Sequence, residues 1–347
     1  MKRGLLLVNL GTPDAPETPE VRRYLREFLS DPRVLDLPAV GRWLLLNLVI
    51  LPFRPARSAA AYREVWTPQG SPLMVHSRAL AAGLVGALGE GWQVELAMRY
   101  GTPSIEQGLQ RLRDAQVSDV TVLPLYPLNA ASSNATAVAK VFEVLQQWFD
   151  FPPVRVVPPF FDQPGYLDAM VAGARPVLEA ARPDHVLFSY HGIPERHLAR
   201  GGHSNGGCGP ESPCVHTLSE RDGHCYRGQS YWLTRELGRR LELAPDTVSV
   251  GFQSRLGRTP WLRPYTDEVL VELAQRGVRR LVVLCPSFVS DCLETLEEIE
   301  IRGRESFRAA GGEELVLVPA LNAAPQWVEA VVQMIEAPVP GLAFPQR

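Results

Sequence analysis

Val186-Leu-Phe-Ser-Tyr-His-Gly-Ile-Pro194 is a short apolar run that ends at a histidine, a glycine and a proline. Leu5-Leu-Leu-Val-Asn-Leu-Gly-Thr-Pro13 follows the same pattern near the start of the chain. A continuous apolar run bounded by turn residues is typical of a buried strand. Two further runs, which begin at Val120 and at Leu281, also resemble each other. The repeated patterns predict two similar lobes with a cleft between them.

Segments of strand and helix character alternate along the chain. The apolar runs predict strands over residues 5–10, 94–97, 120–125, 186–189, 247–250 and 281–284. Amphipathic stretches predict helices over residues 21–29, 77–88, 105–115, 135–149, 166–181, 229–241, 266–275 and 293–310. Strands separated by helices form βαβ units, so we expect an α/β fold with a parallel sheet in each lobe and functional loops at the carboxyl ends of the strands.

The boundary between the lobes is expected in the proline-rich stretch 151–159. We therefore predict a first lobe over residues 1–150, a second lobe over residues 151–320, and a last helix within residues 321–347 that packs back on the first lobe. Residues 200–227 are rich in Gly, Ser, Cys and His and lack apolar periodicity. We interpret them as an insert in the second lobe, because a segment of this length without structure is either functional or disordered.

The composition is that of a globular protein with a sizeable core, since 46% of the 347 residues are hydrophobic and 21% are charged. The formal net charge of -3 argues against nucleic acid as a partner. The first apolar run is too short for a signal peptide, so a cytoplasmic location is the expectation. Trp43-Leu-Leu-Leu-Asn-Leu-Val-Ile-Leu-Pro52 is too short to span a bilayer, and we expect either a buried helix or an exposed lip.

His191 stands at the predicted carboxyl end of its strand, where open parallel sheets bind ligands. An imidazole there can exchange protons near neutral pH, hold a metal, or simply bond a neighbouring carbonyl group. After the strand over residues 281–284, Asp291, Glu294 and Glu298 have the spacing of one helical stripe. The stripe could cap a helix or handle cations and protons. Signature loops for nucleotides and for serine hydrolases are absent from the sequence, so these residues predict a metal- or proton-handling cleft.

Several motifs in order identify the chain as resembling the ferrochelatase family, over nearly its whole length. They are Val8-Asn-Leu-Gly-Thr-Pro13, Phe28-Leu-Ser-Asp-Pro-Arg33, Tyr62-Arg-Glu-Val-Trp-Thr-Pro-Gln-Gly-Ser-Pro-Leu73, His191-Gly-Ile-Pro194, Phe252-Gln-Ser-Arg255 and Asp291-Cys-Leu-Glu-Thr-Leu296. The resemblance implies two flavodoxin-like, chelatase-like lobes around a porphyrin cleft. It also implies a lyase that inserts ferrous iron, as a substrate, into a porphyrin substrate to make haem.

By this resemblance, His191 and Glu294 are the catalytic pair, and Asp291 and Glu298 extend the acidic set that meets the metal. The residues implied on the porphyrin side are Leu10, Arg99, Tyr100, Tyr126, Ser254 and Trp261. Residues 40–55 match the lip that closes over the macrocycle, which favours exposure and contact with a membrane or with another enzyme of the pathway.

Cys208, Cys214 and Cys225 lie close together in the insert. Some ferrochelatases carry a [2Fe–2S] cluster, and thiolates are its usual ligands. Three local cysteines are one short of four, so a histidine or a distant cysteine would have to complete the set. The interpretations left open are a [2Fe–2S] cluster, a zinc ion, and a polar loop without metal.

The identity of the porphyrin substrate is the remaining question. Leu10 replaces a tyrosine that is common in coproporphyrin-type relatives, so the preferred substrate is protoporphyrin IX, with protohaem as the product. The alternative is coproporphyrin III, with coprohaem as the product. A non-catalytic tetrapyrrole- or metal-binding protein would keep the apolar cleft but would not need both His191 and Glu294.

Overall fold

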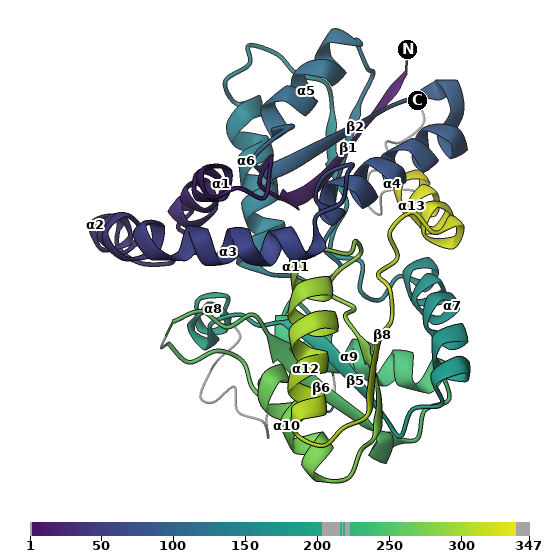
Figure 1. Cartoon of the computed structure of the whole chain (residues 1–347). Coiled ribbons are helices and arrows are strands. Elements are labelled where there is room, and N and C mark those ends of the chain that lie inside the picture. The colour runs from purple at the N-terminus through teal and green to yellow at the C-terminus, as the bar shows by residue number, and fades with distance from the viewer. Residues whose placement is uncertain (1, 203–215, 217, 219–222, 258, 338–347) are drawn as a thin grey trace.

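Two four-stranded parallel sheets form the framework of the chain, one above the other in Figure 1. The computed structural model describes residues 2–202, 216, 218, 223–257 and 259–337. The first sheet contains β1 (Arg3–Gly11), β2 (Trp92–Tyr100), β3 (Val120–Pro124) and β4 (Val154–Val156), in the order β2-β1-β3-β4. The second contains β5 (His185–His191), β6 (Val248–Gln253), β7 (Arg280–Leu284) and β8 (Glu314–Leu317), in the order β6-β5-β7-β8. The predicted α/β class with two parallel sheets is confirmed.

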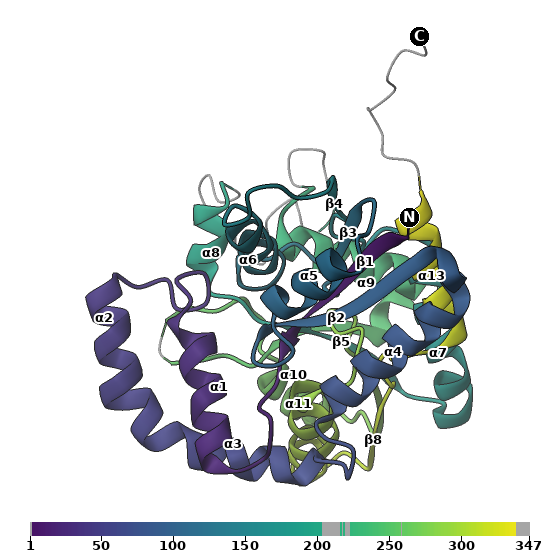
Figure 2. The ribbon, with the colours of Figure 1, turned by 90° about the horizontal axis from the view of Figure 1, so that it is seen from above.

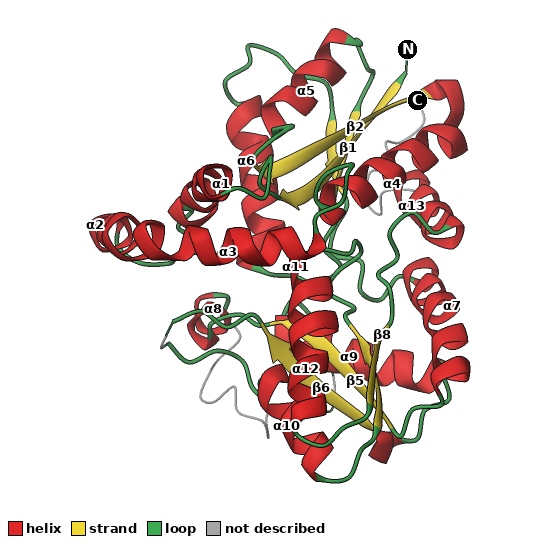
Figure 3. Cartoon of the chain, viewed as in Figure 1, coloured by secondary structure: helices red, strands yellow, loops and turns green. Residues whose placement is uncertain are grey.

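Helices cover both faces of each sheet (Figure 3). The α-helices are α1 (Thr18–Ser30), α2 (Ala39–Leu44), α3 (Leu51–Val65), α4 (Pro72–Leu88), α5 (Ile105–Asp114), α6 (Thr136–Leu145), α7 (Pro164–Ala181), α8 (Glu195–Arg200), α9 (Tyr226–Arg240), α10 (Thr266–Gln275), α11 (Leu293–Thr295), α12 (Arg304–Ala309) and α13 (Pro325–Glu336). The π-helical segments are η1 (Leu45–Ile50), η3 (Ala131–Ala135) and η7 (Leu296–Gly303), and the 3₁₀ turns are η2 (Gly89–Gly91) and η6 (Pro245–Thr247).

The two sheets have the same topology, which explains the repeated sequence runs. β1 and β5 carry the two matching runs, and each lies between the second and third strands of its own lobe. Leu10 and His191 therefore occupy corresponding positions at the carboxyl ends of equivalent strands. In this strand order the ligand-binding crevice lies where the connections diverge, outside the carboxyl ends of the central strands.

β4 and β8 were not predicted from the sequence. Each is an edge strand of three or four residues, and β4 is only half-buried, so its apolar signal is weak. β4 pairs with β3, so the first sheet extends to Val156, inside the proline-rich stretch 151–159.

A hydrophobic cluster joins the lobes on one side. Trp327 of α13 lies against Phe160 and Tyr166, with ring centroids 5.5 and 6.0 Å away, and the Tyr166 hydroxyl donates a hydrogen bond to the carbonyl oxygen of Pro286 in the second lobe, at 2.6 Å. Arg155 of β4 donates to carbonyl oxygens at the end of α13, where a cation suits the helix dipole. The last helix therefore contacts both lobes.

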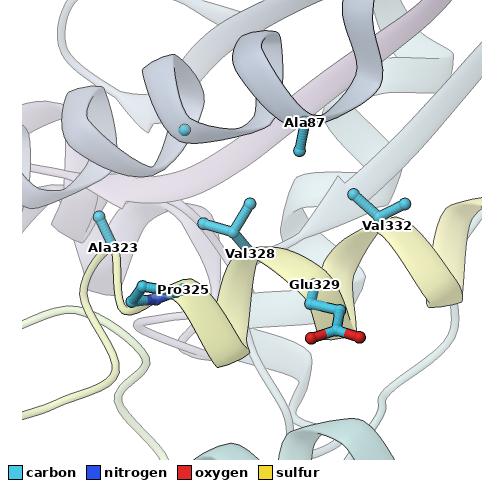
Figure 4. Close-up of a pocket in the computed structure, with 7 residues that line it drawn as sticks. Ala87, Ala323, Pro325, Val328, Glu329 and Val332 are labelled. Carbon is cyan, nitrogen blue, oxygen red and sulfur yellow. The ribbon is translucent and has the colours of Figure 1, made fainter.

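α13 also packs on α4 and leaves a shallow groove between them (Figure 4). The groove is mainly apolar and is lined by Gly83, Ala87, Ala323, Pro325, Val328, Glu329 and Val332. Gly83 allows the close approach, because a Cβ atom there would lie 3.1 Å from the side chain of Val328. The groove lies on the joined side of the lobes, whereas α2 and α8 lie on the opposite side in Figure 1.

α2, η1 and α3 form a helical arm that projects from the first lobe (Figure 2). One face of this arm is buried against α1, through Leu46, Leu51 and Ala59 among others. The other face exposes apolar side chains of the lip, which are Val40, Trp43, Leu44, Leu48, Val49 and Phe53. The predicted alternatives of a buried helix and an exposed lip thus each describe one face. Within the described residues, no helix has the length and apolar character needed to cross a membrane.

Candidate functional site

His191 ends β5 with its ring only partly buried, after six fully buried residues. Its Nδ1 atom lies 2.6 Å from the carbonyl oxygen of Gly192. Since a carbonyl oxygen can only accept, Nδ1 carries the proton in the neutral ring and Nε2 keeps a lone pair. The backbone of His191 is held on both sides, because its N–H donates to the Ser287 hydroxyl at 3.1 Å and its carbonyl oxygen accepts from Tyr226 at 2.7 Å. This arrangement presents a fixed base at the sheet edge.

Glu294 and Glu298 lie on a helix whose turns are wider than the sequence predicts. The predicted α-helix over residues 293–310 consists of α11, the π-helical η7 and α12. In the π-helical geometry, residues four apart lie nearly above one another, and the buried residues Thr295, Ile299 and Gly303 follow this spacing. The same spacing brings Glu294 and Glu298 onto one side, and π-helical turns are frequent at functional sites.

Glu298 is held by Ser254, which follows β6. The Ser254 N–H and hydroxyl donate to its two carboxylate oxygens at 2.8 and 2.5 Å. Burial raises the pKa of Glu298, the Ser254 hydrogen bonds and the charge of His191 lower it in part, and the charge of Glu294 raises it further. These interactions place His191, Glu294 and Glu298 in one electrostatic neighbourhood, so the structure brings three predicted residues together.

Glu294 also faces the residues beneath the lip. Burial and the negative charge of Glu294 both raise the pKa of Tyr62 on α3 and of Tyr24 on α1. Burial lowers the pKa of Arg54, which the charge of Glu294 raises in part. α3 contacts both α11 and η7. Sequence reasoning did not select Arg54 or Tyr24, although an arginine directly after the apolar stretch 43–53 was an available signal.

Asp291 does not belong to the acidic stripe. Its carboxylate accepts hydrogen bonds from the Thr295 hydroxyl at 3.0 Å, the Asn322 amide at 2.8 Å and the backbone N–H of Ala320 at 3.2 Å. Asp291 is 5% exposed and precedes α11 rather than lying within it. Its observed contacts connect the start of α11 to the segment after β8.

Arg99 and Tyr100 are bound to a buried carboxylate instead of being free at a cleft wall. Asp31 accepts hydrogen bonds from Arg99 at 2.6 Å, from the Tyr100 hydroxyl at 3.0 Å and from Thr136 at 2.5 Å. Burial alone would raise the pKa of Asp31, but hydrogen bonds from Thr136 and the Arg33 N–H, together with the charge of Arg99, lower it below its ordinary value. The observed contacts of this pair join α1, β2 and α6.

The remaining predicted porphyrin-side residues lie at the carboxyl edges of the sheets. Leu10 is the second-last residue of β1 and packs between the sheet core and the cluster under the lip. Tyr126 is buried, and among the described residues its hydroxyl has no hydrogen-bond partner. Trp261 donates to the carbonyl oxygen of Leu256 at 2.9 Å and packs beside Gly192, next to His191.

A second contact across the lobes lies beside the site. Asp36, between α1 and α2, is buried and accepts a hydrogen bond from Arg196 of α8 at 2.6 Å. Arg200 and His197 approach the same carboxylate at 3.3 and 3.5 Å. This cluster ties the base of the lip to the helix that follows His191.

The predicted cluster cysteines are only partly visible. Cys208 and Cys214 lie outside the described residues, and Cys225 is buried at the start of α9. Among the residues that the structure describes, no group of three or more His, Cys, Asp and Glu side chains is arranged to hold a metal ion. The [2Fe–2S] cluster therefore stays a prediction.

Comparison with known proteins identifies relatives of the whole chain. The ferrochelatase family profile matches residues 2–338. A ferrochelatase of Coxiella burnetii (strain Dugway 5J108-111) is 46% identical over 96% of this chain and 93% of its own length. A ferrochelatase of Legionella pneumophila (strain Lens) is 43% identical over 96% of this chain and 99% of its own.

Solved structures with the same fold are more distant in sequence. SirB from Bacillus subtilis with Fe³⁺ has a TM-score of 0.53 and 13% identity, over 96% of this chain and 94% of that one. The sirohydrochlorin chelatase SirB from Bacillus subtilis subspecies spizizenii, in complex with cobalt, has a TM-score of 0.53 and 11% identity, with the same coverage. These neighbours show that the two-lobed architecture is a chelatase fold.

Proposed function

The chain belongs to the ferrochelatase family, and from that membership we propose that it inserts ferrous iron into protoporphyrin IX, as a lyase that forms protohaem. Metal insertion into a porphyrin follows from the family. The identity of the porphyrin, the lyase class and the roles of the residues are our proposal. The observation that carries it is the base at His191 beside two glutamates, at the carboxyl edge of the second sheet.

His191 accepts the protons that leave the pyrrole nitrogens. Its Nδ1–H points to the Gly192 carbonyl oxygen, so Nε2 is the atom able to accept a proton. Imidazole is suited to this step because its ordinary pKa lies near neutral pH. The backbone contacts with Ser287 and Tyr226 hold the ring's strand in place, which keeps the base oriented before substrate binds.

Glu294 and Glu298 provide carboxylates for the incoming ion and for the protons that leave the porphyrin. Carboxylates are ordinary oxygen ligands for a divalent metal, which here is the substrate. Burial keeps Glu298 protonated to a higher pH than an exposed glutamate, so it can exchange a proton as positive charge arrives. Bending the macrocycle to expose its nitrogen atoms costs on the order of 1–5 kcal/mol, which binding elsewhere on the ring must supply.

Replacing His191 by alanine tests the role of the base. Loss of a general base lowers turnover by about 100- to 10,000-fold. The assay is anaerobic incubation with Fe²⁺ and protoporphyrin IX, followed by the loss of porphyrin fluorescence. The matched control is His185→Gln, at the opposite end of the same strand. The ring of His185 forms a hydrogen bond with the Ser249 hydroxyl at 2.8 Å. An alanine variant that metallates porphyrin at the native rate would refute the role of His191.

The choice of porphyrin rests on the Leu10 position. An aliphatic side chain at the end of β1 offers no hydrogen bond to additional carboxylates, and coproporphyrin III carries more of them than protoporphyrin IX does. Steady-state turnover on the two porphyrins decides between them. A higher kcat/KM for coproporphyrin III would reverse this part of the proposal and make coprohaem the product.

The lip (residues 40–55) is proposed to contact a membrane surface from the cytoplasm. Six apolar side chains are exposed along it, Arg42 lies among them in the sequence, and the exposed Arg57 follows them. Apolar area together with basic residues favours interfacial binding to anionic lipids. The double variant Trp43→Ser/Phe53→Ser should lose flotation with phosphatidylglycerol vesicles, whereas Phe149→Ser, an exposed aromatic outside the lip, should keep it. Equal flotation of both variants would contradict this proposal.

The predicted [2Fe–2S] cluster has its own test. Cys225 is the described member of the three candidate thiols. If a cluster is bound, the purified protein has visible charge-transfer bands that dithionite bleaches, and it contains acid-labile sulfide. A colourless protein without sulfide removes the cluster from the proposal.

A further inference from the structure

Gln253 is a buried residue whose side chain bonds the backbone of Glu294 and whose backbone bonds the residue after His191. It ends β6 and pairs in register with His191 of β5. Its side-chain Nε2 donates to the backbone carbonyl oxygen of Glu294 at 2.7 Å. The backbone carbonyl oxygen of Gln253 accepts from the N–H of Gly192 at 2.8 Å. One residue therefore touches the chain at Glu294 and the chain beside His191.

A hydrogen-bond chain fixes which way the amide points. The hydroxyl of Ser189 donates to Oε1 of Gln253 at 2.7 Å, and Ser189 in turn lies 2.8 Å from the Thr266 hydroxyl. The Cys285 thiol also lies 3.7 Å from Oε1. Because Oε1 accepts from the strand side, Nε2 must face Glu294 as the donor. Ser189, Gln253 and Thr266 are each at most 3% exposed.

Close packing holds the backbone of Gln253 against the strand that carries His191. A Cβ atom on Gly192 would lie 2.8 Å from the carbonyl oxygen of Gln253, so the two strands approach as closely as a glycine allows. A buried polar side chain is not needed for stability at such a position, since an apolar group of the same shape can be nearly neutral when its partners are also removed. The Nε2 hydrogen bond of Gln253 connects the end of β6 to Glu294 of α11.

We propose that Gln253 is a positioning residue, which sets the orientation of Glu294 relative to His191. The inference rests on the proposed function of that pair. Gln253 acts through the backbone of Glu294 and contacts neither the metal nor the porphyrin. Side chains that act together must be held within a fraction of an ångström, and a misplacement of about 1 Å can cost about 100-fold in rate.

The first test is Gln253→Met, which has a similar length but no amide. We expect kcat to fall by about 100-fold, while KM for porphyrin stays within about twofold, because the apolar contact area is unchanged. The matched control is Tyr190→Phe, which removes a buried hydrogen bond to Thr234 at the residue before His191. The control loses stability without losing kcat. Equal kcat losses in the two variants would overturn the inference.

The second test is Gln253→Glu, which keeps the shape and adds a titratable group. A neutral carboxyl can accept from Ser189 and donate to the Glu294 carbonyl, whereas an ionised carboxyl has no donor. We therefore expect near-native kcat at about pH 6 and a loss of activity by about pH 9 that the unaltered protein lacks. A native pH profile in this variant would overturn the inference, and this result decides the matter if Gln253→Met does not fold.

The outcomes separate this inference from the proposed function. If the unaltered protein metallates neither porphyrin, the proposed function fails and the inference fails with it. If the unaltered protein is active and both Gln253 variants match it in kcat and pH profile, only the inference fails.

Discussion

Replacing Asp31 by alanine should remove about 3–5 kcal/mol of unfolding free energy, because it leaves the Arg99 guanidinium buried without its charged partner. The side chains of Asp31 and Arg99 are 3% and 14% exposed, so water cannot replace the lost bond easily. The carboxylate also accepts hydrogen bonds from Tyr100, Thr136 and the Arg33 N–H. Each hydrogen bond to a charged group contributes about 1.5–3 kcal/mol, and their sum is reduced by the cost of burying the carboxylate.

Urea denaturation followed by tryptophan fluorescence measures this loss. The matched control is Asp119→Ala, which removes an Arg3–Asp119 pair whose side chains are 42% and 30% exposed, and an exposed pair contributes at most about 1 kcal/mol. The folded-state pKa of Asp31 is lowered, so its stabilisation is present above the ordinary pKa of about 3.9 and is lost as pH falls through the folded value. The difference between the unaltered protein and Asp31→Ala should therefore shrink in acid. A cost no greater than that of Asp119→Ala would refute this account of Asp31.

Three further predictions concern residues at and near the candidate site. Gly192→Ala places a Cβ atom 2.8 Å from the carbonyl oxygen of Gln253 and should cost about 1–3 kcal/mol in urea denaturation; an unchanged midpoint would contradict the close approach. Burial lowers the pKa of His197 in the folded protein. As pH drops below about 6.5, the unfolded chain therefore takes up a proton at His197 more readily than the folded protein does, and the free energy of unfolding should fall. His197→Gln should flatten that slope, and an equal slope would exclude the histidine as its source. Ser254→Ala removes a hydrogen bond that lowers the pKa of Glu298, so the acidic limb of the pH–rate profile should move to higher pH. If this limb does not move, Glu298 is not the group that determines it.

The framework of the fold was predictable because its signals are local. Each long central strand is a continuous apolar run, and β1 and β5 show the same run followed by glycine and proline. β4 and β8 escaped prediction because three or four residues at a sheet edge carry too little apolar pattern to stand out. The π-helical geometry of η7 escaped for another reason. Its hydrophobic spacing differs from that of an α-helix by less than one residue per turn.

The sequence predicted which residues form the candidate site better than it predicted which partners they contact. His191, Glu294 and Glu298 come together because the carboxyl ends of neighbouring parallel strands meet at one edge. The partners of Asp291 and Arg99 depend on side chains far away in the sequence, which no local pattern reveals. The contact between Asp36 and Arg196 joins the two lobes, so it exists only once both have folded.

The matching positions of Leu10 and His191 give the two halves of this repeated architecture unequal chemistry. At the same position of the repeat, near the end of the central strand, one half has an aliphatic side chain and the other a titratable ring. A flat guest lying between two such edges would meet an inert surface on one side and a protic surface on the other. Even a molecule with two equivalent faces would thus exchange protons at one face only, and the two halves of the repeat could not replace each other.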